Sequence, residues 1–584
     1  MPRHLLLGRS SSVRDFLIGG INEPLPSLGS GPGNYGVLAP NFSATVEIRS
    51  PQIQITSQSG DGITRTAASL NLSGEIIACT NDIDTLYLPA GVYAGLVLNP
   101  FGISGRIKYL TIKPLPGVSQ SQVIIPGFTF GQSTGTGSVR VRWVRFFDVT
   151  FTYPVSVHRS EDIQFQFCRL TNLNPFGVGG VSVVDGSSIS IGGGTKRLTV
   201  EDSDIGGGYE PRTITGYVGK NEPRGGIITW DPIAGEIVMI NINKPTTSNQ
   251  PLAVVTGESS HGKKINISHQ TDAAGNPLST ADQIKAAVDA HATASEWVAP
   301  TVEGGTGSLP MSLDNHIRTT NYTNNAVICS TGNGEGNQDI VFRRCKVRQC
   351  QVWFNVRMYN NFTIEDCEMW DVSTIGGLGT GASDQHTDGI RTYGGGSNWT
   401  VKRNILWNCG GLLFFTKDGI DINLLVENNL FGPCPINWRS DIVTVSGLTV
   451  VNNTWLSNVT FRRQSAAVDQ PVEHVIWFNN YCAGNVSNID LGSLLQFDFK
   501  DNNRHSSTSN VTPGTNGTTA AAEFNSIGDP WDFPDGNNYI PSAADVIARN
   551  AGISAGGAYS APSNDIINNP RPVGAFDIGA YERQ

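Results

Sequence analysis

A short pattern of hydrophobic and polar positions recurs between residues 340 and 482. The repeated segments read IVFRRCKV, FTIEDCEM, WTVKRNIL, LLVENNLF, LTVVNNTW and VIWFNNYC. Each begins with alternating β-branched or aromatic residues and ends in a polar pair, which is typical of a strand followed by a turn. The repeat lengths are 22, 37, 25, 24 and 27 residues, measured between Cys345, Cys367, Asn404, Asn429, Asn453 and Asn480. Repeats of this size predict a solenoid.

A coil of this length holds about three short strands and leaves no room for a crossover helix. Successive coils are therefore expected to stack in parallel, with apolar residues inside. Stacking would also align Asn429, Asn453 and Asn480, so we expect a ladder of hydrogen-bonded side-chain amides. The alternative is that these are ordinary turn asparagines.

These segments resemble the right-handed parallel β-helix, or pectin-lyase-like, superfamily of polysaccharide lyases, glycoside hydrolases and phage tailspikes. The resemblance covers roughly residues 75 to 500. It implies an all-β fold, a right-handed parallel β-helix solenoid with a small inserted β-rich module carrying one helix. It indicates the fold more specifically than the activity, because one solenoid supports many kinds of site.

Composition narrows the possible partners. Charged residues make up 15% of the chain and the formal net charge is -10, so we expect no nucleic-acid partner. No apolar run is long enough for membrane insertion. The apolar stretch Leu5–Leu7 is too short for a secretory signal. The nine cysteines lie singly and are expected to be buried thiols, and without Cys/His spacing we expect no metal and no cofactor.

The repeat divides the chain into five parts. Residues 1–40 are rich in Gly, Pro and Ser and are interpreted as a tether or virion-attachment segment. Residues 41–205 and 311–500 are the two parts of the β-helix. Residues 206–310 form the inserted module, which resembles a unit of phage structural proteins; Thr280 and Gln283 predict the capping box of its helix. Residues 501–584 are a low-complexity linker and a closing segment, in which Asp577 and Glu582 are expected to be structural.

The 37-residue step contains an additional loop, and such loops often carry function. Its segment His386–Ile390 reads HTDGI and resembles the N-T-D-G-I motif of polygalacturonase-type hydrolases. The resemblance implies that Asp388 helps protonate a leaving group. The chain has no Asp-Asp pair and no Gly-His-Gly, which argues against pectin hydrolysis. Asp388 is either catalytic or a turn-capping residue.

Neighbouring segments are expected to form a groove over this loop. NVRMYN and GIRTYG place Arg357 and Arg391 on one face, with Tyr359 and Tyr393 beside them. A glycosidase would use two of four carboxylates, and a lyase would use a base with cations that hold the substrate carboxylate. The candidates for catalysis are Asp384, Asp388, Asp418 and Asp441, or Lys417 with Arg391 and Arg439; those for substrate binding are Arg357, Arg391, Tyr393, Trp438, Arg439 and His386.

Each of these residues also has a purely structural interpretation. Trp438 and Tyr393 are either sugar-stacking platforms or packing residues, and His386 is either a ligand or a turn hydrogen-bonder. The whole face could also be a solvated surface without catalysis.

The first functional hypothesis is a phage tailspike that binds, and cleaves, a host surface polysaccharide. Its resemblance implies a homotrimer in the virion, joined to other tail proteins through the N-terminus. The second hypothesis is a secreted bacterial polysaccharide lyase or hydrolase. The third is a noncatalytic fibre that only binds glycan.

Overall fold

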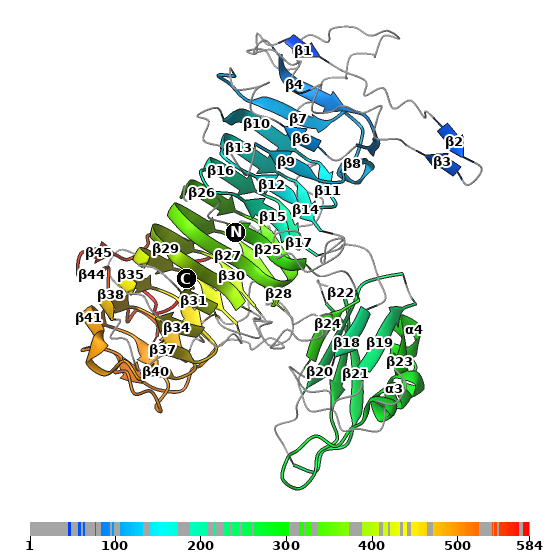
Figure 1. The fold of residues 1–584 in the computed structure, drawn as a ribbon. Helices are drawn as coiled ribbons and strands as arrows, with labels where there is room; N and C mark the ends of the chain where they lie inside the picture. Colours follow the sequence, from blue (N-terminus) through cyan, green and yellow to red (C-terminus); the bar gives the residue numbers. More distant parts are fainter. Residues whose placement is uncertain are drawn as a thin grey trace, which may run out of the picture.

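The structure of the protein is a computed structural model (Figure 1). The structure describes residues 45–47, 57–59, 62–64, 76, 83–93, 96–98, 106–131, 140–172, 187–207, 214–217, 227–233, 235–243, 248–259, 262–302, 315–319, 323–329, 336–372, 388–407, 413–417, 421–432, 436–440, 445–463, 471–524, 540, 542, 544–545, 548–571 and 576–582.

Short strands stack coil upon coil along one axis, and three columns of strands form three sheets, here named A, B and C (Figure 1). Every strand pairing between described coils is parallel, for example β10 with β13 and β13 with β16. The prediction of a parallel β-helix is confirmed.

The strand bounds follow the three columns. Sheet A contains β1 (Thr45–Glu47), β4 (Ile83–Leu88), β7 (Leu110–Pro114), β10 (Val141–Phe147), β13 (Ser160–Gln166), β16 (Lys196–Glu201), β26 (Asn337–Arg343), β32 (Asp421–Glu427), β35 (Val445–Val451), β38 (Val472–Phe478) and β41 (Leu495–Asp501). Sheet B contains β5 (Gly91–Val92), β8 (Val123–Ile125), β11 (Thr150–Phe151), β14 (Arg169–Thr171), β17 (Asp204–Gly206), β28 (Glu368–Val372), β30 (Ile405–Leu406), β33 (Leu430–Phe431), β36 (Thr454–Trp455), β39 (Tyr481–Cys482), β42 (Arg504–His505) and β43 (Thr518–Thr519). Sheet C contains β6 (Leu96–Leu98), β9 (Phe128–Phe130), β12 (Val155–Val157), β15 (Ser187–Ile191), β25 (Thr323–Cys329), β31 (Leu413–Lys417), β34 (Ile436–Ser440), β37 (Val459–Arg463) and β40 (Val486–Ile489).

Two long strands run through more than one sheet. The strand β27 (Lys346–Glu365) contributes to sheets B, C and A in turn, and β29 (Asp388–Lys402) contributes to C and A. Short elements outside the columns are the hairpin β2 (Ser57–Ser59) and β3 (Gly62–Thr64), the 3-10 turns η3 (Gln120–Gln122) and η5 (Gly492–Leu494), and the pair β44 (Ala555–Gly556) and β45 (Tyr559–Ser560).

The interior of the stack is filled by one side chain from each inward position of each strand. In the first coils aliphatic residues surround a group of phenylalanines, of which Phe146 and Phe165 stack with their rings 5.8 Å apart and 8° from parallel. Further along, Phe431 and Trp455 stack at 3.9 Å and 6°. Rings in register along the axis keep the coils in contact at interior density.

The turn between sheets A and B carries the predicted asparagine ladder. The side-chain oxygen of Asn429 accepts from the backbone N–H of Asn404 at 2.9 Å and from its amide nitrogen at 3.0 Å. Asn453 does the same for Asn429, Asn480 for Asn453, and Asn503 for Asn480. All five are buried. The ladder is confirmed and extends one coil beyond the predicted repeats.

The same turn position is occupied differently in earlier coils. Cys168 donates its backbone N–H to the Ser203 hydroxyl at 3.0 Å, and the Cys345 N–H contacts the Cys367 sulfur at 3.4 Å. The six described cysteines are all buried and none is in a disulfide bond, which confirms the prediction of buried thiols for them. Burial raises the pKa of Cys168 to about 12, so its thiol is not a ready nucleophile.

The residue before each ladder position adopts a left-handed conformation, with φ of 50° at Asp202, 51° at Arg344, 55° at Asp366 and 51° at Arg403. These residues form ion pairs between coils. Arg344 binds both carboxylate oxygens of Asp202 at 2.7 Å, and Arg403 binds those of Asp366 at 2.7 and 2.8 Å.

The adjacent sheet A column repeats the same alternation of sign. Its in-register positions read Glu201, Arg343, Glu365, Lys402 and Glu427. Acidic and basic coils therefore alternate along this edge of the stack.

The inserted module lies beside the stack (Figure 1). It contains β18 (Ile214–Tyr217), β19 (Ile227–Pro232), β20 (Val238–Asn243), β21 (Ala253–Ser259), β22 (Gly262–Ser268), α3 (Ala281–Ala290), α4 (Ala294–Trp297), β23 (Val298–Val302) and β24 (Asn315–Arg318). Its own core joins two sheets and α3. The capping box is present: Gln283 N–H donates to the Thr280 hydroxyl, and Thr280 N–H donates to the Gln283 side chain. The module reaches Arg318, past the predicted end at 310.

The interpretation of residues after 500 as a low-complexity linker is wrong. Asn503 occupies the next ladder position, β42 pairs with β39, and β43 pairs with β42. Buried Arg504 forms an ion pair with Asp545 and donates to the Tyr481 hydroxyl at 3.1 Å. The segment lacks the apolar alternation of the other coils. Its polar residues form one more coil because they make the hydrogen bonds of the asparagine ladder.

The closing segment packs against the turns of the last coils. Arg571 is buried and donates to Glu582 at 3.0 Å and to the side-chain oxygen of Asn428 at 2.9 Å. Asp577 accepts from the Asn550 N–H at 2.8 Å. The predicted structural roles of Asp577 and Glu582 agree with this buried network.

Candidate functional site

Every candidate that lies in a described strand falls on sheet C. Arg357 lies in β27; Asp388, Arg391 and Tyr393 lie in β29; Lys417 lies in β31; and Trp438 and Arg439 lie in β34. These four strands are consecutive in sheet C. The stack therefore brings together positions spread over more than 80 residues of sequence.

Alternation along sheet C separates an inner face from an outer face. Phe354 and Val356 are buried in the core while Arg357 is exposed. In β29, Ile390 and Thr392 are buried and Arg391 is half-buried. In β37, Phe461 is buried and Arg462 is exposed. The strand register extends these faces to β31 and β34.

The outer face carries two lines of in-register positions. The first line reads Arg357, Tyr393 and Lys417. The second line reads Asn355, Arg391, Phe415, Arg439, Arg462 and Ile489. The lines lie two residues apart on each strand, about 6.6 Å, and successive coils lie about 4.8 Å apart. Five consecutive coils thus each present one cationic position. We name the set Arg357, Arg391, Lys417, Arg439 and Arg462 the cation ladder.

Two members of this face were missed by the sequence analysis. Phe415 and Arg462 lie on the same in-register line as Arg391. Alternation within a single strand does not reveal this line, because it depends on the register between coils. Counting forward from the preceding asparagine turn could have placed Arg462, since Arg439 lies 10 residues after Asn429 and Arg462 lies 9 residues after Asn453.

The expected position of Tyr359 beside Arg357 is wrong. The pairing of β27 with β29 shifts between Arg357 and Tyr359, so that Arg357 is opposite Tyr393 and Tyr359 is opposite Gly396. Tyr359 is buried in the core, 5.7 Å from the Trp399 ring. A Cβ at Gly396 would lie 2.4 Å from the Tyr359 ring, so glycine is required there.

Trp438 lies in register with buried Phe461, on the inner face of sheet C. This placement favours the packing alternative over a sugar-stacking platform. Within the two lines named above, positions 393 and 415 are aromatic.

Asp388 lies in register with Val352, which in turn pairs with Asn325, and both are buried. The alternation puts position 388 on the same face as Ile390 and Thr392, opposite to Arg391. It also lies five residues before the Tyr393–Lys417 register, or about 16 Å along the strand. The placement favours the structural role for Asp388, and it separates Asp388 from Lys417 by too great a distance for both to act on one bond.

The remaining candidates, Asp384, His386, Asp418 and Asp441, lie outside the described residues. Among the residues that the structure does describe, no group of His, Cys, Asp and Glu is arranged to hold a metal ion, and no helix is long and apolar enough to cross a membrane.

The outer face of sheet C changes at both ends of the cation ladder. Toward the N-terminal coils, Asn355, Ile328 and Ser190 continue the second line, and all three are buried although they lie on the outer face. Toward the last coil the line reaches Ile489, followed by the exposed carboxylate of Asp490.

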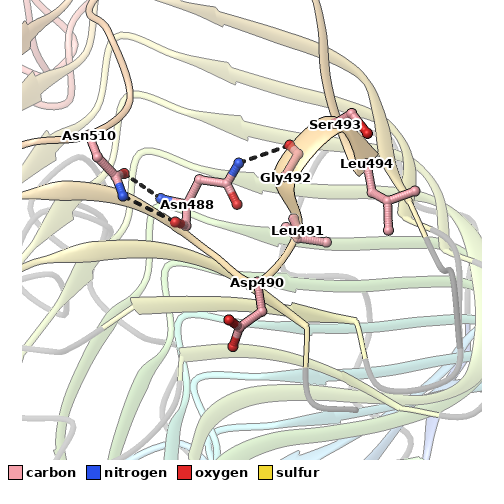
Figure 2. A pocket seen from close by; sticks show the side chains of 7 residues that line it. All are labelled: Asn488, Asp490, Leu491, Gly492, Ser493, Leu494 and Asn510. Atoms are coloured by element: carbon pink, nitrogen blue, oxygen red, sulfur yellow. Dashed lines mark hydrogen bonds between the residues drawn. The ribbon is translucent and has the colours of Figure 1, made fainter. Parts of the chain in front are cut away.

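A shallow depression of 740 Å³ lies at this last coil, lined by Asn488, Asp490, Leu491, Gly492, Ser493, Leu494 and Asn510 (Figure 2). The Asn510 side chain accepts from the Asn488 backbone N–H at 2.7 Å and donates to its carbonyl at 3.1 Å. Asn510 therefore substitutes for a further strand and closes the sheet edge.

The comparisons with known proteins add the following. No protein-family model and no curated protein sequence matches the chain. A surface adhesin of Streptococcus pneumoniae, PfbA, aligns over 74% of this chain and 86% of its own, at 10% identity and a TM-score of 0.28. The A-module of the Azotobacter vinelandii mannuronan C-5 epimerase AlgE6 aligns over 78% and 94%, at 9% identity and 0.19. A pectin methylesterase solved with a hexasaccharide aligns over 79% and 84%, at 10% identity and 0.16. These TM-scores carry no argument about function, and the fold assignment rests on the strand pairings.

Proposed function

We propose that this protein is a tailspike-like virion protein that binds an acidic polysaccharide of a host cell surface on the outer face of sheet C and cleaves it. The observation that carries the proposal is the cation ladder, with one basic position in each of five consecutive coils. The inserted module, whose sequence resembles a unit of phage structural proteins, favours the virion context.

Basic positions are concentrated on this face although the chain as a whole is acidic. The chain has 40 Lys and Arg against 50 Asp and Glu, so a row of basic positions on one sheet face is a local exception. Arginine binds carboxylates through two parallel hydrogen bonds, and four of the five ladder positions are arginine. An acidic polymer that the protein as a whole would repel is therefore attracted to this face.

The row of cations on this face suits β-elimination, in which cations hold the substrate carboxylate. Hydrolysis needs two carboxylates within about 5 to 9.5 Å, and position 388 is separated from Arg391 by an odd number of residues along β29. In β-elimination a base removes the C5 proton of a uronate, a C4–C5 double bond forms, and the C4–O bond breaks. One proton is taken from C5 and one is delivered to the departing oxygen, so no water is consumed.

Lys417 is the candidate base because its position lies between the Arg391 and Arg439 coils, about 8 Å along the diagonal from each. The arginine positions in the coils on either side would neutralise the substrate carboxylate, which makes the C5 proton easier to remove. A polymer bound to the ladder would thus meet both functions at one place.

The test is a panel of acidic and neutral surface polysaccharides incubated with the protein. We expect binding to acidic members, new reducing ends, and the ultraviolet absorbance of an unsaturated uronate. Arg391→Ala and Arg439→Ala should each weaken binding about 10- to 100-fold, as loss of a charge-assisted contact does. Lys417→Met should abolish cleavage and retain most binding. The control is Arg145→Ala on sheet A, which removes a half-buried cation of the amino-terminal coils.

The outcomes separate the alternatives. Reducing ends without the absorbance would indicate a hydrolase, and binding without reducing ends would indicate a noncatalytic fibre; either result overturns the proposed reaction. Unchanged binding in both arginine variants would exclude this face. The mass in solution tests the tailspike context, for which we expect a homotrimer, whereas a monomer favours a secreted bacterial enzyme.

A further inference from the structure

A group of half-buried aromatic residues lies on the outer face of sheet A in the first coils, and in the turn beside it. The Tyr109 and Trp143 rings are 5.0 Å apart, and the Phe147 and Phe167 rings are 5.2 Å apart. Trp143 and Phe147 both belong to β10, where they are separated by about 13 Å along the strand. Between them, the Arg145 guanidinium lies 4.8 Å from the centre of the Tyr109 ring. We name Tyr109, Lys113, Trp143, Arg145, Phe147 and Phe167 the aromatic patch.

Two of these rings stand on strained backbone. Trp143 and Phe167 adopt left-handed conformations, with φ of 60° and 54°. Every other non-glycine residue with positive φ in the described part of the chain is Asp, Asn, Arg, Gln or His. A bulky ring in this conformation costs free energy, and such strain is commonly retained where the side chain has a function. Both rings are half-buried and lie outside the interior core, so the packing of the stack does not account for them.

The two cations of the patch differ from several other basic residues on this face. In the following coils basic side chains bind carboxylates, as Arg197 does with Asp162 at 2.7 Å. Neither Lys113 nor Arg145 forms an ion pair with any residue that the structure describes. Arg145 instead donates to the side chain of Gln164 at 2.7 Å. The patch therefore offers positive charge that the carboxylates of a partner can neutralise.

The opposite end of the same sheet shows how an aromatic outer face is covered. In the last coils β44 packs on β38 and β41, over Phe478 and Phe499. Gly556 approaches so closely that a Cβ there would lie 2.6 Å from the Phe478 ring. The Tyr559 hydroxyl of the adjoining β45 donates to the Glu427 carboxylate. Polypeptide is therefore a cover that this sheet already accepts, and that cover lies at the other end of the stack from the aromatic patch (Figure 1).

We propose that the aromatic patch binds an acidic segment of another protein. The apolar side chains of that segment would pack on the four rings, and its carboxylates would pair with Lys113 and Arg145. Residues 1–40 of this chain carry three arginines against two carboxylates, so their charge does not complement the patch. A glycan fits less well, because its hydroxyls need hydrogen-bond partners and the side-chain oxygen of Gln164 already accepts from Arg145. This inference goes beyond the proposed function and does not depend on it.

The test measures binding of synthetic peptides of about 12 residues, in which apolar residues alternate with Glu, Gln or Lys. The Glu set should bind at least about tenfold more tightly than the Gln set, and the Lys set should not bind. Lys113→Gln combined with Arg145→Gln should remove the preference for Glu over Gln. Arg343→Gln is the matched control, because this arginine of sheet A already pairs with Glu365, and it should leave peptide binding unchanged.

Two asparagine variants separate a binding role from a structural one. Asparagine suits the left-handed conformation, and Asn361 and Asn428 adopt it at the equivalent positions of later coils, with φ of 59° and 53°. Trp143→Asn and Phe167→Asn should therefore unfold at the melting temperature of the parent or above it. Both should weaken binding of the Glu set at least about tenfold, and neither should alter polysaccharide binding on sheet C.

Each result decides the inference. A lower melting temperature in both asparagine variants would assign the rings to the fold and overturn it. Absence of peptide binding, or equal binding of the Glu and Lys sets, would overturn it too. So would a glycan whose binding is lost with Trp143→Asn, or an oligomer that dissociates in that variant, which would make the patch a contact between copies of this chain. If the Glu set binds and no polysaccharide does, the proposed function fails and this inference stands.

Discussion

The coils before and after the inserted module share one architecture and differ in what they present. In the coils before it, the second outer line of sheet C reads Thr129, Ser156 and Ser190. In the coils after β27 it reads Arg391, Phe415, Arg439 and Arg462. Both parts bury apolar residues at inner positions, for example Phe128 and Val155 before the module and Ile390 and Phe461 after it.

This difference shows that the residues at inner positions and those at outer positions are constrained independently. Core packing and strand pairing build a coil from either set, because the outer residues take no part in them. The amino-terminal coils are a support for the stack, and the carboxy-terminal coils carry the candidate site.

The turn ladder gives the largest expected effect. Asn453 donates to Val426 and Val451 carbonyls at 2.9 and 3.0 Å and accepts two bonds from Asn429 at 2.9 Å. Asn453→Leu should lower the free energy of unfolding by about 2–4 kcal/mol, because buried partners lose their bonds. The measurement is thermal or denaturant unfolding, with circular dichroism as the readout.

Ser203→Ala is the matching change in the earlier coils. Its hydroxyl accepts from Cys168 at 3.0 Å and donates to Glu201 at 2.8 Å, so about 1 kcal/mol is expected. Equal losses in the two variants would show that the amide ladder contributes no more than a single hydroxyl.

The closing segment covers only the carboxy-terminal coils, and it should make them sensitive to pH. Burial raises the pKa of Glu582 to about 7, above its ordinary value near 4.5, despite the neighbouring Arg571. Its contribution to stability is complete below pH 4.5 and is lost as pH rises through 7. We expect about 1–2 kcal/mol, after allowance for solvent screening.

Glu582→Gln is the test of that contribution. The difference in melting temperature between the parent and this variant should change between pH 4.5 and 8, with the parent losing stability relative to the variant. A pH-independent difference would contradict the assignment to Glu582.

The smallest expected effect concerns the ion pairs at the edge of the stack. The Asp202–Arg344 pair is partly exposed, with side-chain exposures of 20% and 39%. A double-mutant cycle with Asp202→Asn and Arg344→Gln should give a coupling of about 0.5–1 kcal/mol that shrinks at high salt. A coupling near zero would show that this ion pair does not stabilise the fold.

Much of the fold could be predicted from spacing alone. The recurrence of Asn404, Asn429, Asn453 and Asn480 fixes the coil length and the ladder, and Thr280 with Gln283 fixes a helix start. These features depend on local residues at constant intervals.

The candidate site was harder to predict, because it depends on register between coils. A single irregularity after Arg357 moves Tyr359 from the expected outer face into the core, and the requirement for Gly396 is visible only once the two strands are paired. The sequence left both alternatives for Trp438 open for the same reason, since its register with Phe461 of the next coil is visible only in the paired strands. The coil after residue 500 escaped notice because its apolar content is low and its order comes from Asn503 and Arg504.

The bidentate contact between Asp202 and Arg344 joins two coils that are separated in sequence by the whole inserted module. The carboxylate of Asp202 favours a basic residue at the facing position of the next coil, and an acidic residue there would be repelled. Closing so long a segment costs little more entropy than closing a short one, since the cost grows only with the logarithm of length. The module could therefore be replaced by a different unit without the coils losing their correct order.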